Sequence, residues 1–256
     1  VRANRGLGQH FLIDERVARR QVEAARLRPD ETVLEVGPGL GALTRLLASH
    51  AGRVVAIERD RRLAEGLASL GGNVEVVRGD ALEVEWPRFD VMVSNLPYVI
   101  SSPVTFRLLE TAFDRAVLMY QREFAERIVA RPGTKDYSRL TVNVAHRADA
   151  EILERVPRSA FHPQPRVDSA VVRLVRRPPP YRIEDEAVLH DVVDACFSHR
   201  RKTIANALDL AWQRFSPDRG RWREATRGLP FLGKRPEALS PADFADLANR
   251  IAGAKG

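Results

Sequence analysis

The fold class of this chain follows from one segment, Thr32-Val33-Leu34-Glu35-Val36-Gly37-Pro38-Gly39-Leu40-Gly41. Its first five residues are a short β-rich run, and after the glycines Leu43, Leu46 and Leu47 fall on one face of a helical pattern. Glycine lets the backbone turn tightly and approach a ligand closely. A strand, a glycine-rich turn and a helix in this order predict an α/β fold with a ligand crevice where the strand ends.

Strand-like runs recur along the first 177 residues, separated by helical stretches. After the run that opens the segment above, they cover residues 53–58, 74–77, 89–94, 116–119 and 169–175. Repeated strand–helix units indicate a parallel sheet that is covered on both faces. Periodicity leaves residues 139–156 ambiguous between helix and strand.

The run Arg176-Arg177-Pro178-Pro179-Pro180 predicts a stiff, extended linker, and the sequence pattern changes after it. Beyond it, residues 184–198 carry apolar side chains at helical spacing. Ser240-Pro241-Ala242-Asp243 is typical of a helix start, with a serine cap, proline in the first position and an acid in the first turn. We therefore expect a large α/β domain over residues 1–177 and a small helical domain over residues 178–256.

Composition excludes several classes of protein. The 256 residues are 44% hydrophobic and 29% charged, as in globular proteins, and no apolar stretch approaches the roughly 20 residues of a membrane span. Residues 1–5 are basic but lack the apolar region of a secretory signal. A single cysteine, Cys196, excludes an internal disulfide and fits a cytoplasmic location. The net charge of +7 permits a polyanionic partner. The absence of a long exposed apolar stripe favours a monomer.

Two acidic residues follow strands next to the glycine-rich turn. Glu58 ends the second predicted strand, where ribose hydroxyls fall when a nucleoside occupies such a crevice, and a carboxylate accepts two hydroxyl hydrogen bonds well. Asp80, just past the third strand, suits the amino group of an adenine ring. The G-x-G-x-G spacing differs from the G-x-G-x-x-G of dinucleotide sites. The pattern therefore favours S-adenosylmethionine over NAD.

The tetrapeptide Asn95-Leu96-Pro97-Tyr98 ends the fourth predicted strand and describes an apparatus for holding an aromatic amine. The Asn95 side-chain oxygen and a nearby backbone carbonyl can both accept hydrogen bonds from one amino group. Pro97 supports the turn, and the Tyr98 ring offers a flat face for a base. Methylation of an exocyclic base amine needs this arrangement, because the lone pair of that amine is otherwise delocalised into the ring.

Several motifs in order give the chain a close resemblance to the rRNA adenine dimethyltransferases of the kasugamycin-resistance type. Besides the segments above, they are Gly8-Gln9-His10-Phe11-Leu12, Gly79-Asp80-Ala81, Phe161-His162-Pro163-Gln164-Pro165-Arg166-Val167-Asp168-Ser169-Ala170, Phe197-Ser198-His199-Arg200-Arg201-Lys202-Thr203 and Arg235-Pro236-Glu237-Ala238-Leu239-Ser240. The resemblance covers nearly the whole chain. Histidine in Gly-Gln-His-Phe, where the bacterial pattern more often has asparagine, and the compact length resemble the archaeal branch.

The resemblance implies a Rossmann-like methyltransferase fold with a mostly parallel seven-stranded sheet and a small C-terminal all-helical domain. It implies that S-adenosylmethionine is contacted by His10, Leu12, Gly37, Gly39, Glu58, Asp80 and Asn95. It also implies a substrate of two adjacent adenosines in a hairpin near the 3′ end of small-subunit rRNA, each receiving two methyl groups, and a role in ribosome biogenesis. His10 departs from the commoner asparagine, so we expect its contact to use backbone or a ring nitrogen.

The expected chemistry is mainly positioning, since the methyl group of a sulfonium is already activated. Asn95, Pro97 and Tyr98 are the predicted catalytic residues, and neither a strong base nor a metal is needed. The target adenine must leave its stack to reach the site. Arg200, Arg201 and Lys202 are the predicted contacts to RNA phosphates. A second basic region near the N-terminus holds Arg5, Arg16, Arg19 and Arg20.

Four alternatives remain open at this point. The nearest is an enzyme of the erythromycin-resistance type, which methylates large-subunit rRNA; Leu96 and residues 197–203 favour the small-subunit type. DNA adenine methyltransferases typically carry Asn/Asp-Pro-Pro-Tyr/Phe instead. A ribosome-assembly factor could bind small subunits with methylation secondary. A nicotinamide dehydrogenase is the weakest alternative.

Overall fold

The computed structural model describes residues 9–253. Arg5 of the predicted basic region and Gly8 of the Gly-Gln-His-Phe motif lie outside the described residues. The chain forms two compact units, which divide it at three places. One unit holds the residues up to 126 together with 148–177, and the other holds 127–147 together with the residues from 178 onward.

The first unit is built on a seven-stranded sheet, with a separate two-stranded sheet of β1 and β8 beside it. Its strands are β1 (Phe11–Leu12), β2 (Thr32–Val36), β3 (Arg53–Glu58), β4 (Val74–Arg78), β5 (Val91–Asn95), β6 (Arg115–Gln121), β7 (Ala148–Val156), β8 (Phe161–His162) and β9 (Ser169–Arg176). Its helices are α1 (Glu15–Ala25), α2 (Ala42–Ala48), α3 (Arg61–Ala68) and α4 (Ser101–Glu110), with α5 (Arg122–Ile128) running across the boundary of the two units.

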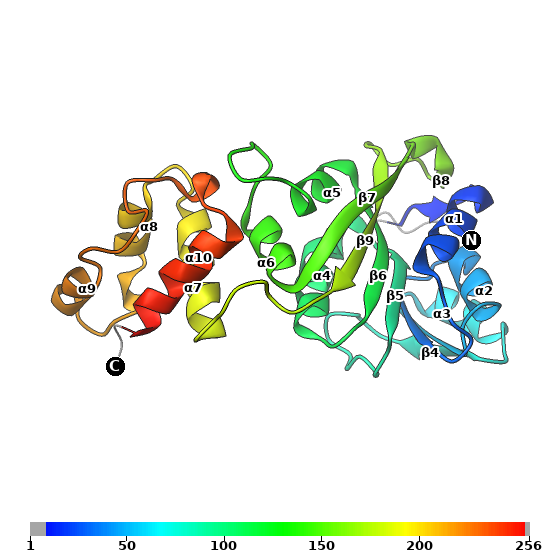
Figure 1. The fold of residues 1–256 in the computed structure, drawn as a ribbon. Helices are drawn as coiled ribbons and strands as arrows, with labels where there is room; N and C mark the ends of the chain where they lie inside the picture. The colour runs from blue at the N-terminus through cyan, green and yellow to red at the C-terminus, as the bar shows by residue number, and fades with distance from the viewer. Residues whose placement is uncertain (1–8, 254–256) are drawn as a thin grey trace. The chain divides into compact units, whose positions relative to one another are not determined.

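The strand order in the large sheet is β4-β3-β2-β5-β6-β9-β7. The five strands from β4 to β6 are parallel, and β9 pairs antiparallel with both β6 and β7. Helices α1, α2 and α3 cover one face, and α4 and α5 cover the other (Figure 1). The expected mostly parallel seven-stranded sheet is confirmed.

The central strands are buried on both faces, which explains why their sequences are nearly continuous apolar runs. In β2, Val33 and Leu34 are fully buried, and β5 and β6 are buried in the same way. The valines of β2, β3 and β5 pack with Leu43 and Leu47 of α2 and with the apolar face of α1. The strand pattern that predicts the sheet is thus the pattern of its core.

The ambiguous residues 139–156 contain one element of each kind. Helix α6 (Arg139–Arg147) is followed at once by the edge strand β7, whose ladder with β9 runs from Ala148 to Val156 with a bulge between Ile152 and Glu154. Charged side chains line this edge, with Glu151 bonded to Arg173 of β9. A charged, bulged edge resists pairing with a second chain.

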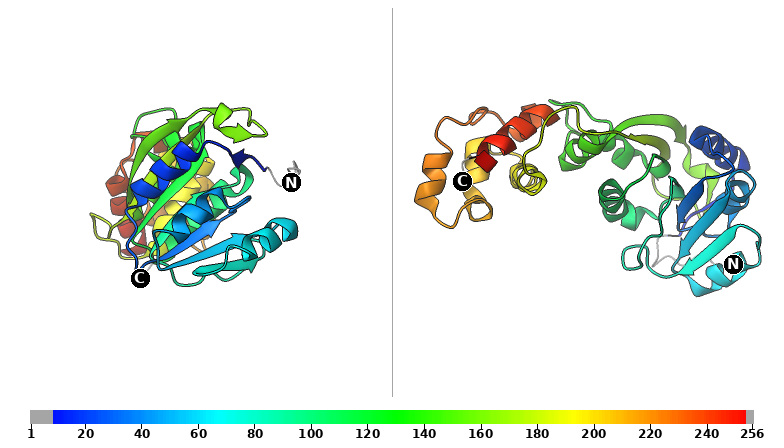
Figure 2. Two further views of the ribbon diagram at one scale, coloured as in Figure 1. Left: turned by 90° about the vertical axis from the view of Figure 1, so that its right-hand side faces the viewer. Right: turned by 60° about the horizontal axis from the view of Figure 1, so that its bottom comes forward.

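The second unit is helical. It contains α6, α7 (Glu186–Ser198), α8 (Ile204–Leu210), α9 (Arg219–Ala225) and α10 (Pro241–Gly253), and Figure 2 shows α7 to α10 from two further sides. Helices α7, α8 and α10 supply most of its core. At the start of α10, the Ser240 hydroxyl accepts from the Asp243 N–H at 3.2 Å while the Asp243 carboxylate accepts from the Ser240 N–H at 2.8 Å, the capping arrangement that the sequence suggests.

The observed units differ from the expected domains of residues 1–177 and 178–256 in one segment. Residues 127–147 belong to the helical unit and not to the α/β unit. They precede the proline run, yet Tyr137 and Val142 are buried in the helical core and Arg139 bonds to Asp194 of α7. The proline run still marks one of the divisions, at residue 178. None of the helices among residues 9–253 is long and apolar enough to cross a membrane.

Candidate active site

The site lies where the chain reverses its direction of travel across the sheet. From β2 the chain moves outward through β3 to β4, and it then returns to place β5 on the other side of β2. Strands β2 and β5 pair only at Val33–Val91 and Leu34–Met92; further along, the Val36 N–H donates to the Ser94 hydroxyl at 2.9 Å instead. Ligands of open α/β sheets bind in the crevice at such a switch point.

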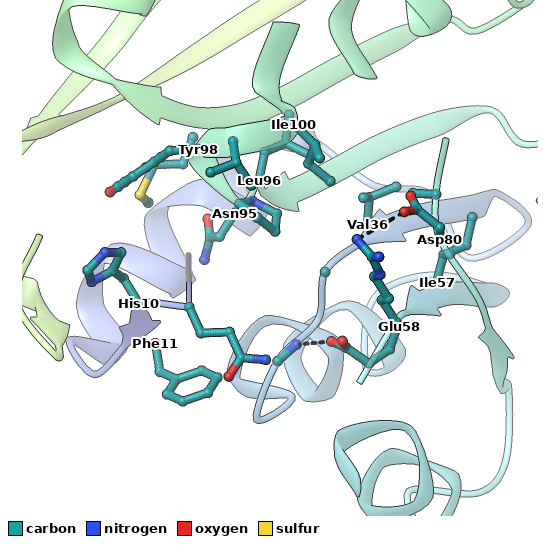
Figure 3. Close-up of a pocket in the computed structure, with 18 of the residues that line it drawn as sticks. His10, Phe11, Val36, Ile57, Glu58, Asp80, Asn95, Leu96, Tyr98 and Ile100 are labelled. Carbon is teal, nitrogen blue, oxygen red and sulfur yellow. Dashed lines mark hydrogen bonds and ion pairs between the residues drawn. The ribbon is translucent and has the colours of Figure 1, made fainter. Parts of the chain in front are cut away.

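A pocket of about 960 Å³, counting the part open to solvent, occupies this crevice. Its wall comes from residues in or directly after the five parallel strands β2 to β6, from the N-terminal segment and from the 95–100 turn (Figure 3). Asn95, Leu96 and Tyr98 lie on one side, Glu58 and Asp80 on another, and His10 with Phe11 on a third (Figure 3). The volume suits a nucleoside-sized ligand.

The glycine-rich turn packs directly on the 95–98 turn. Gly37 and Gly39 have φ angles of +71° and +60°, which L side chains rarely adopt. A Cβ atom on Gly37 would lie 2.9 Å from Cδ of Pro97, and one on Gly39 would lie 3.1 Å from the Phe11 ring. These glycines therefore leave room for two neighbouring parts of the site, and Pro97 contributes by contact with Gly37.

The two predicted acids line the same pocket. Glu58 is 5% exposed; its carboxylate accepts from the Gly39 N–H at 3.1 Å and from the Asp60 N–H at 2.8 Å. Burial raises the pKa of Glu58, and the backbone hydrogen bonds oppose that rise. Asp80 accepts from the Leu82 N–H at 2.9 Å and forms an ion pair with Arg59 at 3.2 Å. Both carboxylates are thus held in fixed positions before any ligand arrives.

The side-chain oxygen of Asn95 is a hydrogen-bond acceptor that the described part of the protein leaves open. Its Oδ1 is buried and has no hydrogen-bond partner among the described residues. A buried acceptor without a donor costs free energy, on the order of 1–3 kcal/mol, and its persistence calls for a ligand or ordered water. Next to it, the Tyr98 hydroxyl lies 2.7 Å from Ser169 Oγ, and the Tyr98 ring stacks with His10 at a centroid distance of 5.8 Å.

The N-terminal motif crosses the pocket, but its predicted members do not all face it. His10 lines the pocket, and its Nδ1 lies 2.7 Å from the Pro163 carbonyl oxygen. Leu12 is not among the lining residues, because its side chain packs against the α1–α2 side of the core while its backbone pairs with Phe161. The other predicted residues of the cofactor site come together in one pocket.

Other residues join the site without having been predicted. Gln9 and Arg59 line the pocket, and a hydrogen bond from Gln9 helps Arg62 to lower the pKa of Asp60 to about 2. In the sequence, Gln9 is marked only by its place in the Gly-Gln-His-Phe motif and Arg59 only by its position next to Glu58. Ser169, which bonds to Tyr98, begins a strand more than seventy residues away. Only its place in the motif of residues 161–170 marks that serine in the sequence.

Glu35 is a further unpredicted residue of interest, in β2 directly before the glycine-rich turn. It is 1% exposed, and burial raises its pKa to about 8, with the charge of Glu58 acting in the same direction and the Thr44 hydroxyl opposing it. An acid between apolar neighbours in a central strand is a signal that the sequence does contain. Because its Oε2 is without a partner in the described part of the chain, Glu35 is best accommodated in its protonated form.

Replacing Glu35 with glutamine is expected to reduce the pH dependence of stability. The unfolded chain releases the Glu35 proton near the ordinary pKa of 4.5 and the folded chain near 8, so wild-type stability falls as pH rises through that window, by up to about 1.4 kcal/mol per pH unit. In urea unfolding, the free energy of unfolding of Glu35→Gln should therefore rise relative to that of wild type between pH 5 and pH 8. Exposed Glu110→Gln is the control. If the difference in free energy of unfolding between Glu35→Gln and wild type were the same at pH 5 and pH 8, the raised pKa of Glu35 would be contradicted.

The predicted RNA contacts lie in the second unit, in the turn between α7 and α8. Arg200 is half-buried; it donates to Glu237 Oε2 at 3.1 Å and to the Thr134 carbonyl at 3.2 Å. Arg201 and Lys202 are exposed and form no ion pair within residues 9–253. In the first unit, Arg19 and Arg20 of the second basic region are paired with acids at 3.5 and 2.5 Å.

The strand order, the glycine-rich turn and the acids that follow β3 and β4 define a Rossmann-like S-adenosylmethionine-dependent methyltransferase. The chain belongs to the ribosomal RNA adenine dimethylase family, whose model matches residues 1–218. It is an enzyme that transfers methyl groups to adenine in rRNA.

Curated relatives and solved structures agree with this family. A probable ribosomal RNA small subunit methyltransferase A from Thermococcus gammatolerans is 49% identical over 249 residues, covering 96% of this chain and 88% of that protein. One of the same name from Methanopyrus kandleri is 49% identical, covering 100% and 95%. Both are archaeal, as the His10 motif suggested. A dimethyladenosine transferase from Plasmodium falciparum has a TM-score of 0.79 at 31% identity, covering 93% of this chain and 96% of that one. The 23S rRNA methyltransferase ErmE has a TM-score of 0.68 at 36% identity, covering 94% and 99%.

Proposed function

We propose that this enzyme dimethylates N6 of two adjacent adenosines in the hairpin near the 3′ end of small-subunit rRNA, with S-adenosylmethionine as methyl donor. The observation that carries the proposal is the buried, unpartnered Oδ1 of Asn95 in the same pocket as Glu58 and Asp80. An acceptor for an amine thus lies beside the groups that suit a nucleoside cofactor.

The residues of the pocket fit S-adenosylmethionine. Gly37 and Gly39 leave a cradle that a Cβ would fill, Glu58 suits ribose hydroxyls, and Asp80 suits an adenine amino group. His10 and Asn95 complete the proposed set on the other side of the pocket, and Leu12 would contribute through its backbone. When bound, the cofactor supplies an activated methyl group.

The protein's contribution is to position the target base. The base leaves its stack and lies on the Tyr98 ring. Asn95 Oδ1 and the carbonyl of Leu96 or Pro97 accept the two amine hydrogens, which favours a tetrahedral nitrogen with its lone pair free for in-line displacement. The proton of the methylated ammonium leaves to water, so the site requires no strong base. Holding the nitrogen in this geometry is worth several orders of magnitude in rate.

Small-subunit rRNA is proposed as the target because curated relatives at 49% identity are named small-subunit methyltransferases and because Leu96 and residues 197–203 resemble that type. The similarity to ErmE favours large-subunit rRNA as the second candidate. Methyl transfer from labelled S-adenosylmethionine to unmethylated small subunits, large subunits and DNA separates them. Label confined to small subunits is the expected result. Label in large subunits would overturn the proposed target and favour large-subunit rRNA instead. A ribosomal substrate also implies a cytoplasmic location.

The RNA-binding surface is proposed to consist of three loops of the second unit rather than one turn. Arg200 ties the 199–203 turn to Glu237 and to Thr134, and the Gly133 N–H donates to the Glu237 carbonyl. The Ile204 N–H donates to the carbonyl of Lys234. These bonds bring together six exposed cations that form no ion pair with any acid in the described part of the chain, namely Arg131, Lys135, Arg201, Lys202, Lys234 and Arg235. In this surface Arg200 braces the loops, while its neighbours face solvent.

Replacing Arg201 and Lys202 together with alanine is expected to weaken binding to small subunits and to flatten its dependence on salt. Each lost phosphate contact lowers the slope of log K against log salt by roughly 0.7 to 0.9. Arg200→Ala is expected to lower the melting temperature as well, because it leaves Glu237 unpaired. Arg250→Ala, which removes a cation paired within α10 at 3.0 Å, is the matched control. An unchanged slope of log K against log salt in the double variant would refute the proposed role of this surface in RNA binding.

A further inference from the structure

The motif from Phe161 to Ala170 has no role in the chemistry described so far, yet two of its groups reach the base-stacking residue. Ser169 Oγ lies 2.7 Å from the Tyr98 hydroxyl. The Pro163 carbonyl lies 2.7 Å from Nδ1 of His10, and the His10 ring stacks on Tyr98. One stretch of chain therefore supports Tyr98 twice, once directly and once through His10.

The direct support is anchored in the sheet. Ser169 is fully buried at the start of β9, where it is in register with Gln121 of β6 and Val156 of β7. The hydroxyl that holds Tyr98 is thus fixed by neighbours on both sides, unlike a group on a mobile loop. Burial raises the pKa of Tyr98, so its hydroxyl stays protonated and keeps this hydrogen bond.

The second support fixes the orientation of His10. A carbonyl oxygen only accepts, so Nδ1 of His10 carries the proton and donates it to Pro163. The strand pair of β1 with β8, in which Phe11 faces His162, holds the two segments together on either side of this bond. The His10 ring then lies at 28° to the Tyr98 ring with 5.8 Å between centroids, which is an offset stack.

We propose that His10 and Ser169 are positioning residues for the target adenine, acting through Tyr98. His10 covers one face of the Tyr98 ring and leaves the other face for the base, while Ser169 fixes the plane of the ring. The extruded adenine then meets a surface that is already oriented and loses less freedom on binding. This inference rests on the proposed function, and it gives His10 a second role, toward the target base, beside its proposed contact with the cofactor.

The test measures kcat and KM for unmethylated small subunits at saturating cofactor, together with the Kd for S-adenosylhomocysteine. Ser169→Ala and Tyr98→Phe each remove the same hydrogen bond, and each is expected to lower kcat/KM for the RNA substrate roughly five- to tenfold. The double variant should lose no more than either single variant. The affinity for S-adenosylhomocysteine should stay within about twofold of wild type throughout, since no cofactor contact is removed.

His10 is tested with two replacements. His10→Ala removes the stack and should lower kcat/KM for the RNA substrate, whereas His10→Phe keeps a ring on Tyr98 and should restore most of it. Unchanged RNA kinetics at saturating cofactor in His10→Ala, whatever its S-adenosylhomocysteine affinity, would overturn the proposal and leave His10 with a cofactor contact alone. Unchanged kinetics in Ser169→Ala, Tyr98→Phe and His10→Ala would also overturn it. Absence of methyl transfer by wild type measured in parallel would instead reject the proposed function.

Discussion

Asn95→Ala is expected to lower kcat for methyl transfer by about 100- to 1000-fold, the usual effect of removing one group that is oriented for the transition state. The buried Oδ1 has no partner among residues 9–253, so nothing else in the described protein depends on it for a hydrogen bond. Without it, the amine of the target base keeps its lone pair in the ring. Single-turnover rates with labelled cofactor on small subunits provide the measurement.

The same variant should keep most of its affinity for S-adenosylhomocysteine, because Gly37, Glu58 and Asp80 remain in place when the one proposed contact of Asn95 is lost. Asn206→Ala, at an exposed asparagine of α8, is the control for handling and folding. Near-wild-type turnover would reject the role of Asn95. Tight binding of the inactive variant to small subunits would reveal a separate role in subunit assembly.

Gly37→Ala is expected to abolish both cofactor binding and methyl transfer. Two effects combine at this position: a φ of +71° that alanine rarely adopts, and a Cβ placed 2.9 Å from Cδ of Pro97. Relief of the clash moves the glycine-rich turn or the 95–98 turn, and each carries half of the proposed site. We expect a loss of about 1–3 kcal/mol in the free energy of unfolding, together with loss of measurable S-adenosylhomocysteine binding by calorimetry.

Gly72→Ala separates the two effects. Gly72 has a similar φ of +64°, but a Cβ there would meet nothing within 4 Å. This control should lose stability through backbone strain and retain cofactor binding and activity. Retained S-adenosylhomocysteine affinity in Gly37→Ala would mean that the packing of Pro97 on the glycine-rich turn is not what shapes the pocket.

Much of the fold could be predicted because its signals are local. The runs that became β2, β3, β5, β6 and β9 are apolar over the length of a strand, as a buried sheet requires. Glu58 and Asp80 follow consecutive strands, and parallel strands bring such residues to one edge of the sheet. Their meeting in one pocket with Gly37 and Asn95 was therefore predictable.

The rest depends on contacts between distant parts of the chain. Residues 127–147 cluster with the helical unit because Tyr137 and Val142 find their apolar neighbours there, on helices that come forty residues or more later. Arg200 looked like its exposed neighbours but is held by Glu237. The Tyr98–Ser169 hydrogen bond also joins residues that no periodicity connects. Each of these requires the folded topology.

Target and reaction are both read out by mass spectrometry of nuclease fragments from small-subunit rRNA after incubation with the wild-type enzyme and S-adenosylmethionine. We expect one modified fragment, from the hairpin near the 3′ end, carrying two methyl groups on N6 of each of two adjacent adenosines, and at most a trace of it with Asn95→Ala over the same time. Methylation only of large-subunit rRNA, or equal product from Asn95→Ala, would contradict it.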